Sequence, residues 1–142
     1  MAAYYMNEAL FDLPDAWFID RTVTYLAGTS PQGEGVLLLI ERRPVPPDKS
    51  FRQIVTIFGK DALTRYTGYQ VLFEREVEVS GRPALDVAAR WRSENGEPVY
   101  VRRIHFIAGE TWLILTGEAP IAEREFCDAY VNHVAGSLQL RE

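Results

Sequence analysis

The sequence offers few side chains that could perform covalent chemistry. Its single cysteine, Cys127, lies six residues before His133, and a thiolate activated by an imidazole is a common nucleophilic pair. However, Cys127 falls between Phe126 and Tyr130 in an apolar helical pattern. Burial in such a pattern favours an inert packed thiol over a reactive one. We therefore expect Cys127 to have a packing role.

The other histidine, His105, is the second candidate for catalysis, because imidazole is the commonest general base. It occurs in a strand pattern, where it shares a face with Val101 and Arg103. That position favours a polar pairing role. We expect no catalytic residue, and a small enzyme that uses His105 or Cys127 stays as the alternative.

Sequence motifs for cofactors and metals are missing. The chain contains no G-x-S-x-G elbow, phosphate-binding loop, dinucleotide fingerprint, H-E-x-x-H or EF-hand pattern. One cysteine excludes an internal disulfide framework and a multi-thiolate zinc site. The net charge is -5 and the isoelectric point about 5.1, and the basic pairs Arg42-Arg43 and Arg102-Arg103 are too sparse for a nucleic-acid surface. We expect no cofactor, no metal and no nucleic-acid partner.

Length and hydropathy limit the number of domains and the possible membrane segments. The 142 residues form one domain, 1–142, with 47% hydrophobic and 25% charged residues. The longest apolar run, Val36 to Ile40, is far shorter than the about 20 residues of a membrane span. The N-terminus has neither the basic start nor the apolar stretch of a secretory signal. We expect a cytoplasmic protein with no stable membrane insertion.

Alternating and helical patterns predict the elements. We expect an extended N-terminal segment, a hairpin, a helix, a meander of four strands and a closing helix that begins at Pro120. Their predicted ranges are Tyr4–Leu13, Arg21–Ala27, Gly35–Arg42, Ser50–Tyr66, Phe73–Val79, Ala84–Arg92, Val99–Ile107, Thr111–Gly117 and Pro120–Ala135. Asp48 or Ser50 can cap the long helix. This order predicts the α+β class, an antiparallel sheet with helices packed on it.

The predicted hairpin and long helix carry more apolar surface than one core requires. In the second hairpin strand Leu37 and Leu39 point opposite to Leu38 and Ile40, so both faces need cover. Full burial of each such side chain contributes about 1.5–3 kcal/mol, and a large apolar face is rarely left in water. Three ways to bury this second apolar face remain possible. The closing helix and the N-terminal segment could pack on it, an apolar partner could bind it as a groove, or a second copy of the chain could contact it.

Several short motifs together resemble the DcrB-like domain proteins, and in particular the Eag-type adaptor chaperones of type VI secretion. The order and spacing of these motifs carry the resemblance over nearly the whole chain. The motifs are Asn7-Glu8-Ala9, Leu13-Pro14-Asp15-Ala16-Trp17, Asp20-Arg21-Thr22, Leu39-Ile40-Glu41-Arg42, Ser50-Phe51, Gly68-Tyr69, Gly81-Arg82-Pro83-Ala84, Trp91 and Arg102-Arg103-Ile104-His105-Phe106.

The resemblance implies a PsbP-like α/β/α sandwich that forms a homodimer. It also implies binding of the apolar, transmembrane-like N-terminal helices of an effector that carries a spike-tip (PAAR) domain, by helix-in-groove recognition. The residues expected to bind the effector helix are Val23, Tyr25, Leu37, Leu39, Glu41, Phe58, Ala62, Tyr66, Val101 and Arg103.

Four of these positions depart from the family's pattern. The family places small or amide side chains where this chain has Leu37, Glu41, Phe58 and Arg103. A binding module for a lipid or another small apolar ligand on the same surface is the alternative function.

Overall fold

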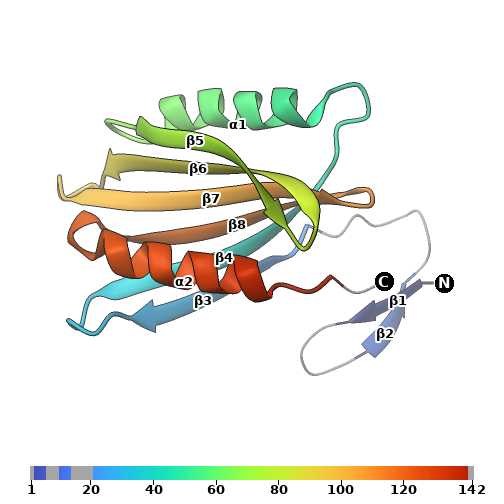
Figure 1. Cartoon of the computed structure of the whole chain (residues 1–142), viewed down its shortest axis with the longest axis horizontal. Coiled ribbons are helices and arrows are strands. Elements are labelled where there is room, and N and C mark those ends of the chain that lie inside the picture. The colour runs from blue at the N-terminus through green and yellow to red at the C-terminus, as the bar shows by residue number, and fades with distance from the viewer. Residues whose placement is uncertain (1, 6–9, 14–20, 141–142) are drawn as a thin grey trace.

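A six-stranded antiparallel sheet forms the centre of the computed structural model, which describes residues 2–5, 10–13 and 21–140 (Figure 1). The strand order is β3-β4-β8-β7-β6-β5. The strands are β3 (Val23–Thr29), β4 (Gly35–Pro44), β5 (Gln70–Val79), β6 (Arg82–Arg92), β7 (Pro98–Ala108) and β8 (Thr111–Pro120). The helices are α1 (Phe51–Arg65), the short 3-10 helix η1 (Ile121–Glu123) and α2 (Arg124–Ser137). The predicted α+β class is confirmed.

The helix α2 covers one face of the sheet, in front of the strands in Figure 1. Beneath it lies the larger hydrophobic core, which includes Tyr100, Phe106, Leu115 and Val131. The strand β5 contributes Phe73, Val77 and Val79 to this core. The alternation of these residues with glutamates in the sequence predicted that they share one face.

The helix α1 packs on the opposite face, so the fold is an α/β/α sandwich. Its core is smaller and joins Ile54 and Val55 of the helix to Leu85, Trp112 and Ile114 of the sheet. Ser50 caps the helix through a capping box with Gln53, in which each side chain bonds the other residue's backbone N–H. An exposed ion-paired arginine of α1, Arg52, contacts Glu74 and Glu76 of β5.

Several element boundaries differ from the sequence-based expectation; for example, β5 begins three residues earlier than predicted and β3 two residues later. The predicted closing helix begins four residues later, because Pro120 still belongs to β8, where it pairs with Val99, and η1 intervenes before α2. The N-terminal segment forms two strands, β1 (Ala2–Tyr5) and β2 (Leu10–Leu13), which pair in a separate two-stranded sheet. In the described part of the chain, no helix is both long and apolar enough to cross a membrane.

Candidate functional site

The strand residues predicted to bind an effector helix share one face of the sheet, the face on which α1 lies. Across the ladder, Tyr25 of β3 is opposite Leu39 of β4, which is opposite Thr116 of β8, which is opposite Arg103 of β7. The neighbouring row joins Leu37, Glu118 and Val101 in the same way. Because side chains alternate between faces with a period of two, these residues project to the same side. The structure therefore brings the predicted strand residues together.

The predicted helix residues line the underside of α1 and its C-terminal end. Phe58, Ala62 and Tyr66 are spaced by four residues, which places them on one stripe of a helix. The Phe58 ring contacts His105 and Trp112 edge-on, at centroid distances of 5.1 and 6.0 Å. The helix therefore stands directly over β7 and β8.

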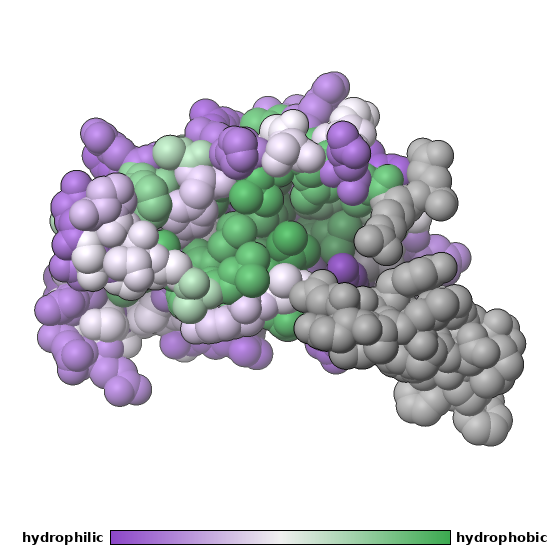
Figure 2. Space-filling view, turned by 90° about the horizontal axis from the view of Figure 1, so that it is seen from below, coloured by the Kyte–Doolittle hydropathy of each residue, from purple (hydrophilic) through white to green (hydrophobic). Residues whose placement is uncertain are grey.

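Part of this sheet face extends beyond α1 and is not covered by it. We call this part the β3–β4 face and define it by Val23, Tyr25, Leu37, Leu39 and Glu41. Tyr25 is 60% exposed and Val23 46% exposed, while the three β4 residues are half-buried. Figure 2 looks toward the β3 edge and shows a hollowed hydrophobic area between hydrophilic rims. Contiguous exposed apolar surface of this kind marks an interaction site.

Three of the predicted residues are buried within the chain itself. Ala62 is 2% exposed, Val101 is fully buried and Arg103 is 7% exposed. Ala62 and Val101 contact residues of their own protomer, so an arginine at position 62 would disturb the packing of α1 rather than only block a partner. Of the residues predicted to bind the effector helix, the more exposed ones therefore lie on β3 and β4.

Arg103 lies in a cage of three aromatic rings. Its guanidinium carbon is 5.2 Å from the ring centroid of Phe58, 5.5 Å from that of Tyr66 and 6.0 Å from that of Tyr69. One of its nitrogens, Nη1, donates a hydrogen bond to Tyr69 Oη at 3.0 Å. Cation–π contacts stabilise a desolvated guanidinium. They leave most of its N–H groups available for another acceptor.

His105 follows two residues later on the same face and is 1% exposed. Trp112 Nε1 donates to His105 Nδ1 at 3.2 Å, so Nδ1 carries no proton. Burial, together with the positive charges of Arg103 and Arg43, lowers the pKa of His105 to about 3. The ring is therefore a neutral tautomer that carries its proton on Nε2.

We predict that His105 stays neutral between about pH 4 and pH 7. Because the unfolded imidazole binds its proton near pH 6.5 and the folded one only near pH 3, this histidine makes the protein less stable as the pH falls through that interval. Nitrogen-detected NMR of the ring checks the prediction. We expect the pattern of an Nε2–H tautomer throughout; a charged ring at pH 6 would contradict it.

A cleft of about 200 Å³ opens between α1 and the strands β5, β6 and β7. Arg103 and His105 both line it, and the side chains around them are mostly apolar. The cleft is lined by Val55, Thr56, Phe58, Gly59, Lys60, Leu63, Tyr69, Val71, Glu74, Val87, Arg103 and His105. Arg103 thus belongs both to this cleft and to the row that contains Tyr25 and Leu39 of the β3–β4 face.

The remaining chemically reactive groups lie in packed surroundings. Burial raises the pKa of the Cys127 thiol to about 11, so the thiol is protonated at neutral pH. Burial also raises the pKa of Glu118, partly offset by the charge of Arg103. Among the described residues, no group of three or more His, Cys, Asp or Glu side chains is arranged to hold a metal ion.

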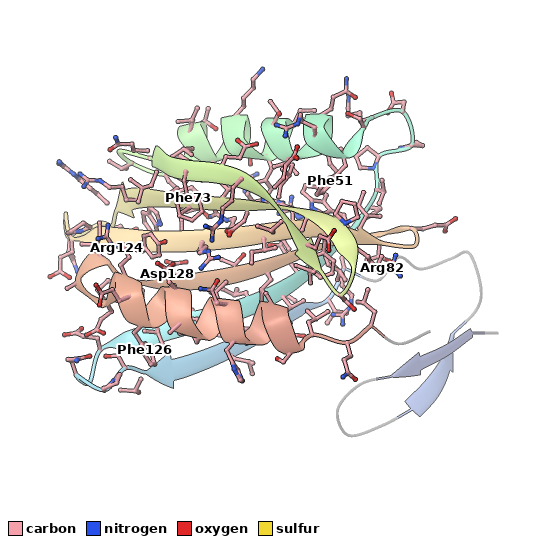
Figure 3. The ribbon with its side chains drawn as sticks, viewed as in Figure 1. Phe51, Phe73, Arg82, Arg124, Phe126 and Asp128 are labelled. Atoms are coloured by element: carbon pink, nitrogen blue, oxygen red, sulfur yellow. The ribbon has the colours of Figure 1, made fainter. Side chains whose placement is uncertain are left out.

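A buried charge network lies on the other side of the sheet. Asp86 accepts two hydrogen bonds from Arg102, at 2.9 and 2.7 Å, and one from Arg75 at 3.0 Å. Asp128 extends from α2 toward the sheet (Figure 3) and accepts from Tyr100 at 2.7 Å and from Arg102 at 3.3 Å. This network links β6 and β7 to α2.

Sequence reasoning did not identify the cleft residues on α1 and β5. Gly59, Lys60 and Leu63 lie on the predicted helix, whereas Tyr69 and Val71 precede the predicted strand Phe73–Val79. Their convergence depends on how α1 crosses the sheet. One signal was present in the sequence. An arginine and a histidine two residues apart in an apolar strand must share a buried face and need partners there.

Comparisons with known proteins agree with this architecture. A protein of unknown function from Pseudomonas aeruginosa, PA94, superposes with a TM-score of 0.88 at 20% identity, over 100% of this chain and 98% of that one. LpqN of Mycobacterium tuberculosis, described as involved in cell envelope biogenesis, has a TM-score of 0.61 at 11% identity, over 83% of each chain. Cyanobacterial PsbP of Synechocystis sp. PCC 6803 has a TM-score of 0.58 at 14% identity, over 99% of this chain and 92% of that one.

These similarities establish a PsbP-like fold. No curated protein matches the sequence. The residues 6–9 and 14–20, which carry the opening motifs of the resemblance, lie outside the described residues. The family model DcrB matches residues 8–131, and the chain therefore belongs to the DcrB family.

Proposed function

We propose that this protein is a cytoplasmic adaptor chaperone, which binds the apolar N-terminal helices of a type VI secretion effector of the PAAR type and helps to load it onto the secretion spike. The observation that carries the proposal is the β3–β4 face. It exposes large apolar side chains on a sheet that already has a complete core on each side. A transmembrane-like helix needs such a surface to stay out of water.

The shape of the β3–β4 face supports the binding of a helix. Its residues come from two adjacent strands, whereas Phe58 of α1 stands over β7 and β8, so α1 leaves this part of the sheet open. A helix that lies against the strands would contact alternate side chains of β3 and β4 with its apolar face. Glu41, which bonds Arg43, offers a polar group at the end of this surface.

The proposal includes a homodimer. The strand β3 pairs only with β4 among the described strands. Its outer edge therefore presents backbone N–H and C=O groups that could pair with a strand of another chain. Tyr25 and Leu26 expose 60% and 52% of their surface on the two sides of this edge. Two copies would together present a longer apolar surface to the effector.

An aspartate on the β3–β4 face is expected to abolish binding. We predict that Tyr25→Asp and Leu39→Asp each weaken effector binding by tenfold or more, equivalent to about 1.4 kcal/mol, because a carboxylate is costly to desolvate against an apolar helix. The measurement is co-purification of an effector that is encoded beside this gene and carries apolar N-terminal segments followed by a spike-tip domain.

A matched control separates a general effect of charge from loss of the site. Leu72 lies on β5 at the opposite edge of the sheet and is 39% exposed, so Leu72→Asp is expected to bind the effector normally. Circular dichroism verifies that all three variants are folded. Normal effector binding by both folded Tyr25→Asp and Leu39→Asp would rule out the β3–β4 face as the site.

A further inference from the structure

The cleft between α1 and the strands β5–β7 has apolar walls and polar groups at its floor. Its walls include Val55, Leu63, Val71 and Val87. Its volume of about 200 Å³ is below the about 300–1,000 Å³ of most sites for drug-sized ligands. The shape therefore suits a short aliphatic chain with one polar end.

Arg103 supplies the first polar group at the floor. A guanidinium has five N–H donors, and Arg103 uses one of them on Tyr69 Oη. Although the side chain is 7% exposed, no carboxylate of the described residues forms an ion pair with it. The charge of Glu118 acts on it without forming an ion pair, and burying a cation without a directly paired anion is costly. The cation–π cage compensates only in part, so an anion in the cleft would complete the site.

His105 supplies the second polar group. Because its Nδ1 accepts from Trp112, its Nε2–H is a donor, and no described residue accepts from it. The ring is 1% exposed and lines the cleft. Two donors from buried side chains, two residues apart on β7, thus face the same small space. Neither donor is a fully buried orphan, since Trp91 Nε1 is the one such side-chain atom among the described residues. Both are therefore accessible to a ligand in the cleft, and a carboxylate is an acceptor with two oxygens.

The charges around the cleft also favour an anion. Lys60 stands at its rim. Glu74, the acidic residue in the lining, is paired with Arg52 at 3.4 Å. Outside the lining, Glu41 is paired with Arg43, and Glu118 interacts with Arg103 without forming an ion pair. The cleft is thus locally positive within a protein of net charge -5.

We propose that this cleft binds a small aliphatic carboxylate, with its head group on Arg103 and His105 and its chain along Val71, Val87 and Leu63. A bidentate pairing of guanidinium and carboxylate provides both strength and orientation. The lining of the cleft contains no residue of the β3–β4 face, and its occupation does not require an effector. The proposal therefore stands or falls separately from the proposed function.

Calorimetric titration of the purified protein with octanoate, 1-octanol and octylammonium tests the proposal. We expect octanoate to bind, and the other two compounds, which share its chain, to bind at least tenfold more weakly. Arg103→Met keeps a side chain of similar length without the charge and is expected to raise the dissociation constant of octanoate by tenfold or more. Arg90→Met is the matched control, because Arg90 is exposed on the opposite face of β6.

A second variant keeps the test valid if Arg103→Met folds poorly. A side chain built at Gly59 meets no atom within 4 Å, so Gly59→Leu is expected to fill the cleft, to leave the helix intact and to abolish octanoate binding. The proposal is overturned if octanoate does not bind the folded protein, if 1-octanol binds as tightly, or if octanoate binds folded Gly59→Leu or Arg103→Met unchanged.

Discussion

Replacing Asp86 with alanine is expected to reduce the free energy of unfolding by about 3–5 kcal/mol, because it leaves a buried cation without its partner. Asp86 is fully buried and Arg102 is 2% exposed. Two of the guanidinium nitrogens of Arg102 donate to the Asp86 carboxylate, at 2.9 and 2.7 Å. Without the carboxylate, Asp128 at 3.3 Å would be the one acceptor left for Arg102 among the described residues.

Urea unfolding monitored by circular dichroism measures the loss. Glu76→Ala is the matched control, because Glu76 also forms an ion pair with an arginine but is 80% exposed; such surface pairs contribute about 0–1 kcal/mol. The double variant Asp86→Leu with Arg102→Met should recover much of the lost stability, since it removes both charges. If Asp86→Ala lowers the free energy of unfolding by less than about 1 kcal/mol, the buried pair of Asp86 and Arg102 contributes no more than a surface ion pair, and the prediction is wrong.

The second large effect is expected at Gly117 of β8, which α2 approaches closely. A Cβ atom on this residue would lie 2.3 Å from Val131 Cγ2, 3.0 Å from Cys127 Sγ and 3.1 Å from Tyr130 Cε1. The helix would have to move outward to admit it. We therefore predict that Gly117→Ala reduces the free energy of unfolding by about 1–3 kcal/mol or more.

Thermal and urea unfolding of Gly117→Ala check this prediction. Gly59→Ala provides the control, since a methyl group there meets nothing within 4 Å and removes a helix-interior glycine that costs about 0.5–1 kcal/mol. The two glycine-to-alanine changes should thus have opposite signs. Adding Val131→Ala to Gly117→Ala should show favourable coupling in a double-mutant cycle; additive effects would argue against the close approach.

The sequence patterns were sufficient for most of the fold because each strand carries its own periodicity. The alternation of Phe73, Val77 and Val79 with glutamates predicted the inward face of β5 correctly. The closing helix was placed too early because a proline suits both the first turn of a helix and the end of a strand. Pairing of Pro120 with Val99 decided between them, and no local pattern records that long-range contact.

The sequence predicted which residues of the candidate site share a face of the sheet, but not which of them are exposed and which are buried. The period of two identified which residues of β4 and β7 project together, and the register confirms that Leu39 and Arg103 do so. The exposed fractions depend on where α1 crosses the sheet. Arg103 is buried because Phe58, Tyr66 and Tyr69 surround it, and these residues come from a part of the chain at least 34 positions away.

The two helices are attached to the sheet in unequal ways, and this has a consequence for how the molecule can open. Contact between α2 and β8 is direct at Gly117, and Asp128 ties the helix to Arg102. In contrast, α1 rests on a few bulky side chains and on the exposed ion pairs of Arg52. Lifting α1 breaks fewer buried contacts, so local opening should begin there while α2 stays in place. The side of the sheet covered by α2 is thus the more firmly packed one, and the cleft lined by Arg103 lies under the less firmly packed helix α1.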